Sequence, residues 1–235
     1  MQVTYLGHSG FLVEWEDTAC LFDWSEGELP SVGPDRKLYI FASHAHSDHY
    51  REEIFTLGRR HGNPVYVLSS DIPEHPEETS CGRVVRLAPG AKRRFAGGEK
   101  GVLNVFTLGS TDEGVAFLVN YAGKTIYHAG DLHWWAWPDD SPAEAQSMKE
   151  RFFREIAVLK GLKLDAAFLP LDSRLEENYW LGFDALMRTA NIQNAFPMHM
   201  WRDYPVVDRF CDREDSAPYR DKIRKVSWAG QAFEI

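Results

Sequence analysis

The segment Ser43-His44-Ala45-His46-Ser47-Asp48-His49 directly follows an apolar run at residues 38–42 that predicts a strand. In an extended chain residues i and i+2 point to the same side, so His44 and His46 can bind one metal ion together. If the chain turns into a helix after His49, then Asp48 and His49 face a second point nearby. A lone HxH pair is more often a solvated turn, but the complete HxHxDH string at a strand end is specific. The segment therefore predicts ligands for two adjacent metal ions.

The composition limits the class of protein before any other motif is considered. A chain of 235 residues is long enough for one large domain, and we expect residues 1–235 to form a single one. The formal net charge of -9 argues against nucleic-acid and anionic-membrane partners. No basic leader and no run of about 18 apolar residues is present, so a cytoplasmic protein is expected. The three cysteines form no CxxC pair, so imidazoles and carboxylates must hold any metal.

The pattern of apolar residues and turn signals predicts strands followed by helices in each half of the chain. Such an order suits two sheets packed face to face with helices on both outer surfaces. The predicted fold class is therefore α/β, a four-layer αββα sandwich. The predicted strands cover residues 3–6, 11–15, 19–22, 38–42, 65–68, 83–87, 102–107, 115–121, 125–128, 165–169, 194–197 and 223–235, and the predicted helices cover residues 50–60, 143–160 and 176–190.

The HxHxDH string resembles the signature of the metallo-β-lactamase superfamily. The resemblance implies an αββα sandwich around one or two metals, with further ligands supplied later in the chain. A predicted strand ends in Gly130-Asp131, which resembles the family's element for a carboxylate that bridges both metals; a turn-capping aspartate is the alternative. Pro197-Met198-His199-Met200 resembles the last family element. It makes His199 a ligand of the second metal, unless this residue is a core histidine.

One family element has no counterpart in the expected place. The family usually supplies a third histidine to the first metal from a loop that here spans residues 108–114, and this loop contains no histidine. Asp112 is the candidate substitute, besides Glu113. Either Asp112 joins His44 and His46, or the first site is weak and the second site dominates. Zinc is the expected metal, and a carboxylate at this position would shift the preference toward manganese or iron.

Two further residues are candidates for positions beside the metals. The string Gly7-His8-Ser9 resembles the branch of the superfamily that includes L-ascorbate-6-phosphate lactonase. That resemblance implies a histidine near the metals, where His8 either polarises substrate or supports the ligands; a turn-stabilising hydrogen bond is the alternative. Asp23 follows the predicted strand at residues 19–22, and it either fixes the tautomer of a ligand imidazole or caps a turn.

Aromatic and polar residues follow the predicted ligands closely along the chain. Tryptophans near Asp131 and His199 are expected either to wall the metal pocket or to pack in the core. Polar residues near the same elements are candidates for binding an anionic group, phosphate or carboxylate, on a small-molecule substrate. The tryptophans are Trp134, Trp135, Trp137 and Trp201, and the polar candidates are Arg174, Arg202 and Tyr204.

Together these residues predict a metal-dependent hydrolase. Two divalent cations carry a charge of four, of which Asp48 and Asp131 offset about half, and such a cluster lowers the pKa of a bridging water to about 7. Asp48 or Asp131 then orients the nucleophile toward a small-molecule ester, lactone or phosphoester. A nuclease, or a protein that binds metal at a single closed site without catalysis, is the alternative. The oligomeric state is left open.

Overall fold

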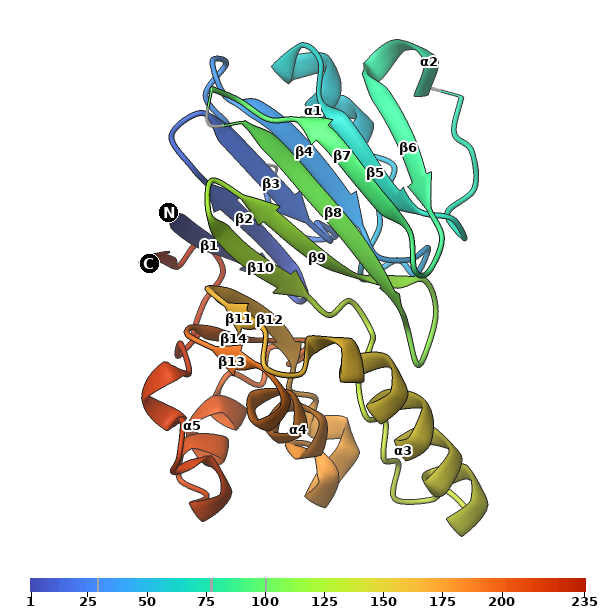
Figure 1. The fold of residues 1–235 in the computed structure, drawn as a ribbon, viewed down its shortest axis with the longest axis vertical. Coiled ribbons are helices and arrows are strands. Elements are labelled where there is room, and N and C mark those ends of the chain that lie inside the picture. Colours follow the sequence, from blue (N-terminus) through green and yellow to red (C-terminus); the bar gives the residue numbers. More distant parts are fainter. Residues whose placement is uncertain (29, 77, 100) are drawn as a thin grey trace.

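The computed structural model describes residues 1–28, 30–76, 78–99 and 101–235, and Figure 1 shows that they build two β-sheets with helices outside them. The strands of the first sheet are β1 (Gln2–Gly7), β2 (Gly10–Glu14), β3 (Thr18–Phe22), β4 (Lys37–Ala42), β5 (Val65–Ser69), β6 (Arg83–Leu87) and β15 (Ala232–Glu234). Their order in the sheet is β15-β1-β2-β3-β4-β5-β6. Strands β3 to β6 run parallel, so their carboxyl ends lie at one edge of the sheet.

The second sheet has a similar arrangement. Its strands are β7 (Lys92–Ala96), β8 (Val102–Gly109), β9 (Val115–Tyr121), β10 (Lys124–His128), β12 (Ala166–Pro170) and β14 (Ala195–Met198). Their order is β14-β12-β10-β9-β8-β7, and β10, β12 and β14 run parallel. A hairpin joins β9 to β10 through Ala122 and Gly123, whose positive φ values of 50° and 75° suit a tight turn. A separate parallel pair consists of β11 (Lys163–Leu164) and β13 (Asn191–Ile192).

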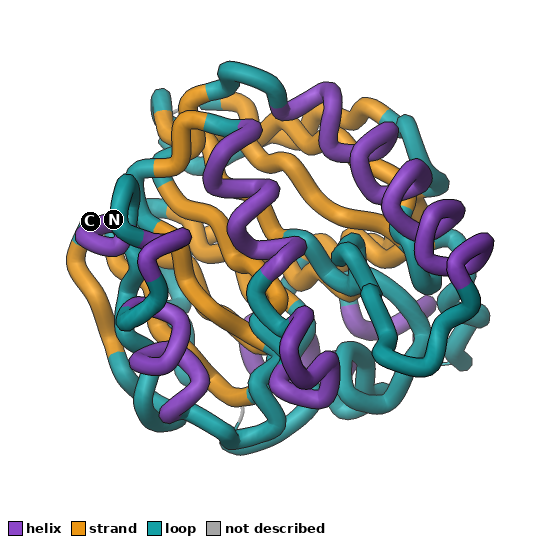
Figure 2. The backbone as a smooth tube through the Cα atoms, turned by 90° about the horizontal axis from the view of Figure 1, so that it is seen from below, coloured by secondary structure: helices purple, strands orange, loops and turns teal. Residues whose placement is uncertain are grey.

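Helices cover the outer faces of both sheets. The α-helices are α1 (Ile54–His61), α2 (Glu78–Cys81), α3 (Pro142–Ile156), α4 (Leu181–Thr189) and α5 (Pro205–Cys211), and the 3-10 turns are η1 (Ala157–Leu159), η2 (Ser173–Asn178), η3 (Glu214–Ser216) and η4 (Arg220–Lys222). Helix α1 packs on the first sheet, and the view from below in Figure 2 shows the later helices lying across strands of the second. The predicted four-layer sandwich is confirmed.

The main core lies between the two sheets. Phe11 of the first sheet contacts Phe168 of the second with ring centroids 4.4 Å apart, and Phe22 lies 6.4 Å from Phe117 in the same way. All four rings are completely buried, and burying each contributes about 1.5 to 3 kcal/mol. A second cluster of apolar residues joins α1 to the outer face of the first sheet. Two rigid sheets thus hold the loops that leave their edges.

The start of α3 follows from its sequence. Ser141 caps the helix by accepting a hydrogen bond from the Glu144 backbone, the Glu144 side chain accepts one from the Ser141 backbone, and Pro142 occupies the first turn. The prediction of a helix near residues 143–160 is therefore correct in position. No helix in the described part of the chain is long and apolar enough to cross a membrane.

Three predicted elements were wrong in extent. Helix α1 begins at Ile54 rather than residue 50, because the preceding chain forms a tight turn. The helix predicted over residues 176–190 begins at Leu181, because Glu176 has φ 52° and kinks the chain inside the preceding 3-10 turn η2. The strand predicted over residues 223–235 is reduced to β15, since the chain turns at Gly230 with φ 91°.

At one edge of the sandwich, the loop between β8 and β9 packs directly against the segment that follows β4. Gly114, in the loop between β8 and β9, has φ 71°, and a Cβ on it would lie 2.0 Å from the Ser43 carbonyl oxygen. The next residue, Val115, donates its backbone N–H to that carbonyl at 2.9 Å. Glycine is therefore required at this contact. It brings the loop containing Asp112 against the segment that starts at His44.

Candidate metal centre

The HxHxDH segment is a turn rather than an extended chain. The backbone N–H groups of His49 and Tyr50 both donate to the carbonyl oxygen of His46, at 3.0 and 2.9 Å. The expected alternation of side chains along an extended segment is therefore wrong. The expected pairing is nonetheless present, because the bend still directs His44 and His46 toward one point and Asp48 and His49 toward another.

The first group of potential ligands consists of His44, His46, Asp112 and Asp131, whose ligand atoms all lie within 4.8 Å of one another. His44 Nε2 lies 3.7 Å from Asp131 Oδ2, and His46 Nδ1 lies 3.8 Å from Asp112 Oδ2. Glu113 lies 3.5 Å from the other ring nitrogen of His46. Of the two arrangements left open by the sequence, the geometry favours the one in which Asp112 joins the two histidines.

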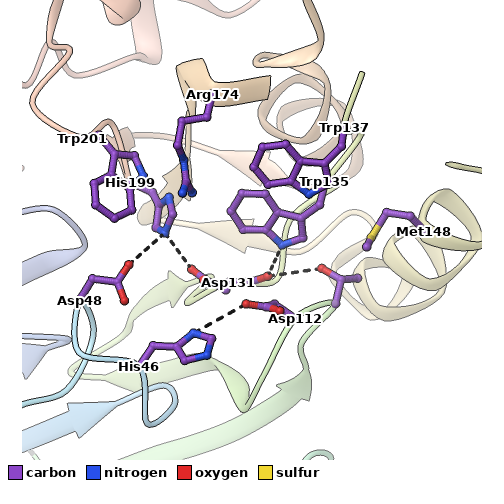
Figure 3. Close-up of a pocket in the computed structure, with 11 residues that line it drawn as sticks. His46, Asp48, Asp112, Asp131, Trp135, Trp137, Met148, Arg174, His199 and Trp201 are labelled. Carbon is purple, nitrogen blue, oxygen red and sulfur yellow. Dashed lines mark hydrogen bonds and ion pairs between the residues drawn. The ribbon is translucent and has the colours of Figure 1, made fainter. Parts of the chain in front are cut away.

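The second group consists of His8, Asp48, His49 and His199, again within 4.8 Å of one another. Asp48 Oδ2 lies 3.3 Å from His8 Nε2 and 3.8 Å from His199 Nε2. Asp131 also faces this group, because its Oδ1 lies 3.1 Å from His49 Nε2 and 3.5 Å from His199 Nε2. Figure 3 shows Asp131 between Asp48, His199 and Asp112. Its two oxygens thus point to the two groups, as expected for a bridging carboxylate.

The polar atoms at the centre of this cluster fit a metal ion. His44 Nε2, His49 Nε2, His199 Nε2 and Asp131 Oδ1 are all buried, and none has a hydrogen-bond partner within the described residues. Buried polar atoms in folded proteins are almost always satisfied, so such a concentration of polar atoms without hydrogen bonds requires an explanation. Neutral imidazole nitrogens and carboxylate oxygens are ligands of divalent cations, and cations placed between the two groups would satisfy them.

Hydrogen bonds at the Nδ1 atoms hold two of the imidazoles in the tautomer that leaves Nε2 available to a metal. His49 Nδ1 lies 2.7 Å from Asp23 Oδ2, and His44 Nδ1 lies 3.0 Å from the hydroxyl oxygen of Ser43, which itself donates to Asp23 at 2.6 Å. A proton held on Nδ1 leaves the Nε2 lone pair free for a metal. Asp23 therefore takes the tautomer-fixing position, which was one of its two expected roles.

Asp172 does the same for His199, and sequence reasoning missed it. Its Oδ2 lies 2.9 Å from His199 Nδ1, and its side chain is completely buried. Asp172 lies two residues after the end of β12, and similarly Asp23 lies one residue after β3 and Asp131 three residues after β10. The signal that could have found it is therefore a carboxylate directly after a buried parallel strand, although many turn aspartates share that position.

Burial and mutual interaction shift the pKa values of the imidazoles and carboxylates in the cluster. Burial, together with the neighbouring His49, lowers the pKa of His44 to about 4, so that this ring is neutral at pH 7 as a metal ligand must be. Burial alone would also lower the pKa of His49, but the carboxylates of Asp131 and Asp23 raise it well above its usual value. Burial would raise the pKa of Asp131, yet His49 and the other imidazoles lower it strongly. The carboxylates are thus ionised.

His8 is part of the second group rather than a residue of a remote turn. Its φ is 43°, and its carbonyl oxygen accepts the backbone N–H of His199 at 3.1 Å. The His8 ring lies 4.3 Å from that of His199 and 4.7 Å from that of Trp201, between centroids, and burial lowers its pKa. The backbone of His8 therefore anchors one potential ligand while its side chain faces another, Asp48.

Two other histidines near Asp131 are not in the cluster. Nε2 of His128 lies 2.9 Å from the carbonyl oxygen of Ser9, and its Nδ1 accepts the N–H of Gly130 at 3.1 Å, so His128 is a packing residue. His133 is completely buried, and burial lowers its pKa to about 4. It packs against Trp135 and Phe152.

A cavity of about 360 Å³ opens directly above the cluster. Trp135, Trp137 and Trp201 line it, whereas Trp134 packs against Phe152 and Phe153 instead. A second cavity of about 440 Å³ lies on the other side of Trp201 and shares Asp48 with the first. The expectation of aromatic walls is therefore right for three of the four tryptophans. The list of residues lining the first cavity is His46, Asp48, Thr111, Asp112, Asp131, Trp135, Trp137, Met148, Arg174, His199 and Trp201.

The role of Asp172 leads to a testable expectation. Asp172→Asn keeps the size of the side chain but removes the charge that holds the His199 proton on Nδ1. We expect the affinity for a divalent metal to fall about 10- to 100-fold, measured by competition with a chromogenic chelator. Asp165→Asn is the matched control, since Asp165 lies at the opposite end of β12 and pairs with Lys124. Unchanged affinity in Asp172→Asn would show that His199 needs no such support.

The fold and the two facing groups of ligand-type residues define a class, the metallo-hydrolases built on an αββα sandwich. The chain belongs to the beta-lactamase superfamily: a family model described as a beta-lactamase superfamily domain matches residues 2–136, which include the HxHxDH segment and Asp131. Within the superfamily the chain is a member of the UPF0173 metal-dependent hydrolases. A protein of that name from Korarchaeum cryptofilum is 32% identical over 217 residues, covering 88% of this chain and 86% of the relative.

Two further similarities extend over the chain. A UPF0173 metal-dependent hydrolase from Heliobacterium modesticaldum is 25% identical over 225 residues, covering 89% of this chain and 86% of the relative. The solved structure of Igni18, a metallo hydrolase from the archaeon Ignicoccus hospitalis, superimposes with a TM-score of 0.67 at 19% identity, covering 100% of this chain and 98% of that one. At this identity the structural similarity establishes the fold.

Proposed function

We propose that the protein hydrolyses a small-molecule ester, lactone or phosphoester with the help of two adjacent divalent metal ions. His44, His46 and Asp112 would hold the first ion, and Asp48, His49 and His199 the second. Asp131 would lie between them with one oxygen toward each. Zinc is the preferred metal for the histidines, while the three carboxylates shift the preference toward manganese or iron.

The observation that carries the proposal is the shared centre of the two groups. Buried nitrogens of His44, His49 and His199 and an oxygen of Asp131 converge there without hydrogen-bond partners in the described residues. A divalent cation bound at such a centre supplies Lewis acidity toward water and toward a carbonyl or phosphoryl oxygen, which makes hydroxide available at neutral pH. Burying these polar atoms without hydrogen bonds costs free energy of folding. Their presence is therefore better explained by function than by stability.

The residues around the centre have separate roles in the proposed reaction. Asp48 is exposed over 31% of its side chain, whereas Asp131 is nearly buried, so Asp48 is the carboxylate placed to orient an attacking water from the cavity side. His8, at 3.3 Å, keeps the Asp48 carboxylate in place. Trp135 and Trp137 wall the cavity on the other side and exclude bulk water from the reacting groups. A cavity of about 360 Å³ suits a small substrate.

The proposal is tested with a panel of aryl esters, lactones, phosphomonoesters and phosphodiesters, assayed with zinc, manganese or iron. We expect turnover that a chelator abolishes, and a loss of about 100-fold or more in kcat/KM for His46→Ala. His61→Ala is the matched control, because His61 lies at the end of α1 and contacts the Gly33 carbonyl oxygen. Equal rates for wild type and His46→Ala would end the hydrolase proposal. One tightly held ion without turnover would instead indicate a metal-binding protein.

A further inference from the structure

We propose that Arg174 binds an anionic group on the substrate, a carboxylate or a phosphate, and so selects anionic esters and lactones over neutral ones. The inference rests on the proposed hydrolase function and names the class of substrate for the same site. It assigns the anion to one end of the cavity and the scissile bond to the other end, above Asp131.

The guanidinium of Arg174 is fixed in place with donors to spare. Its Nε donates to both oxygens of Asp172, at 3.0 and 2.9 Å, and its Nη2 donates to Asp172 Oδ2 at 2.5 Å. An arginine has five N–H donors in a rigid fork, and this contact engages one side of the fork. Within the described residues Nη1 has no hydrogen-bond partner, and the side chain is 45% exposed where it lines the cavity. The free side of the fork is thus available to a ligand.

Two tryptophans hold the guanidinium from its flanks. The centre of the guanidinium lies 4.5 Å from the ring centroid of Trp201 and 5.6 Å from that of Trp137. Figure 3 shows Arg174 pointing into the cavity, toward the space above Asp48 and Asp131. A cation held between aromatic rings and a buried carboxylate loses little further freedom when it binds a ligand. Arg174 is therefore preorganised for a planar or tetrahedral anion.

The charge of the cavity is divided between its ends. Among the described residues that line it, Arg174 is the one arginine or lysine, while the acidic residues Asp112 and Asp48 lie toward the metal end. The other arginine considered from the sequence, Arg202, is 75% exposed, pairs with Glu26 at 2.6 Å and lines the second cavity. An anion that enters the first cavity therefore has a single side-chain cation to meet besides the metals.

The test uses two esters that differ in charge at one position. In 4-nitrophenyl hydrogen adipate the acyl chain ends in a carboxylate too distant to attack its own ester readily, and in 4-nitrophenyl 6-methylheptanoate an isopropyl group takes its place. Arg174→Met keeps the apolar stem between the tryptophans but removes the fork. We expect kcat/KM for the anionic ester to fall about 10- to 100-fold, mainly through KM, while the neutral ester changes less than about threefold. An equal fall for both esters would overturn the proposal and leave Arg174 a support for Asp172.

Anion binding by Arg174 can also be measured without turnover. Because Trp137 and Trp201 flank Arg174, saturable quenching of tryptophan fluorescence by succinate or by inorganic phosphate is expected in the metal-loaded wild type. The quenching should be lost in Arg174→Met and kept in Arg202→Met, with metal content unchanged in all three. Retained quenching in Arg174→Met would refute the role of Arg174. If neither ester is hydrolysed but quenching depends on Arg174, the hydrolase proposal fails for esters while the anion site stands.

Discussion

Replacing Asp131 with alanine is expected to reduce bound metal from the proposed two ions per chain to one or none and to lower kcat/KM about 1,000-fold or more. Asp131 faces both ligand groups, with Oδ2 3.7 Å from His44 Nε2 and Oδ1 3.1 Å from His49 Nε2. Its removal therefore takes a ligand from each proposed ion at once. The substitution also removes negative charge that would offset two neighbouring cations. A fall of about 1,000-fold in kcat/KM corresponds to the loss of several kcal/mol of transition-state stabilisation by the metals.

The metal content is measured by mass spectrometry after dialysis, and the rate on whichever substrate of the panel is turned over. Asp139→Ala is a matched control, since it makes the same chemical change at an exposed residue in the same loop. Two ions retained in Asp131→Ala, with a rate within a few-fold of wild type, would contradict the bridging role. A circular dichroism spectrum like that of the wild type separates loss of metal from loss of fold.

Replacing Asp23 with alanine is expected to lower the free energy of unfolding of the metal-free protein by about 3 to 5 kcal/mol. Asp23 is completely buried and accepts hydrogen bonds from the backbone and the hydroxyl of Ser43, at 2.8 and 2.6 Å, besides its contact with His49 Nδ1. Alanine would leave all of these donors buried without their partner. The favourable charge of Asp23 near His128 and His49 would also be lost.

Urea denaturation in the presence of a chelator measures this effect apart from metal binding. Asp35→Ala is the control, because Asp35 is exposed and lies before β4. In the same variant, metal affinity is expected to fall about 10- to 100-fold, because His49 loses the group that fixes its tautomer. A stability loss below about 1 kcal/mol would mean that water replaces the carboxylate, and the buried network around Ser43 would then carry little energy.

Local sequence determined a large part of the fold. Alternating apolar residues predicted most strands to within two residues, and Ser141 with Pro142 marked the start of α3, because these signals act between neighbours in the chain. Strand β7 escaped prediction because four of its five residues are exposed and only Phe95 is buried. The helix expected from residue 176 does not begin there, because Glu176 has a non-helical backbone within η2. Local helix propensity did not predict this kink.

The sequence by itself determined that the protein carries an HxHxDH segment at a strand end, with Asp131 and His199 as partners further along the chain. For Asp131 and His199 the resemblance of their segments to family elements was needed, since a Gly-Asp turn or a single histidine has a commoner structural explanation. Only the tertiary structure grouped Asp112, rather than Glu113, with His44, His46 and Asp131. It also revealed Asp172 behind His199 and separated Arg174 from Arg202. Those distinctions depend on distances between residues far apart in the chain, which arise when the two sheets pack and bring their loops together at one edge.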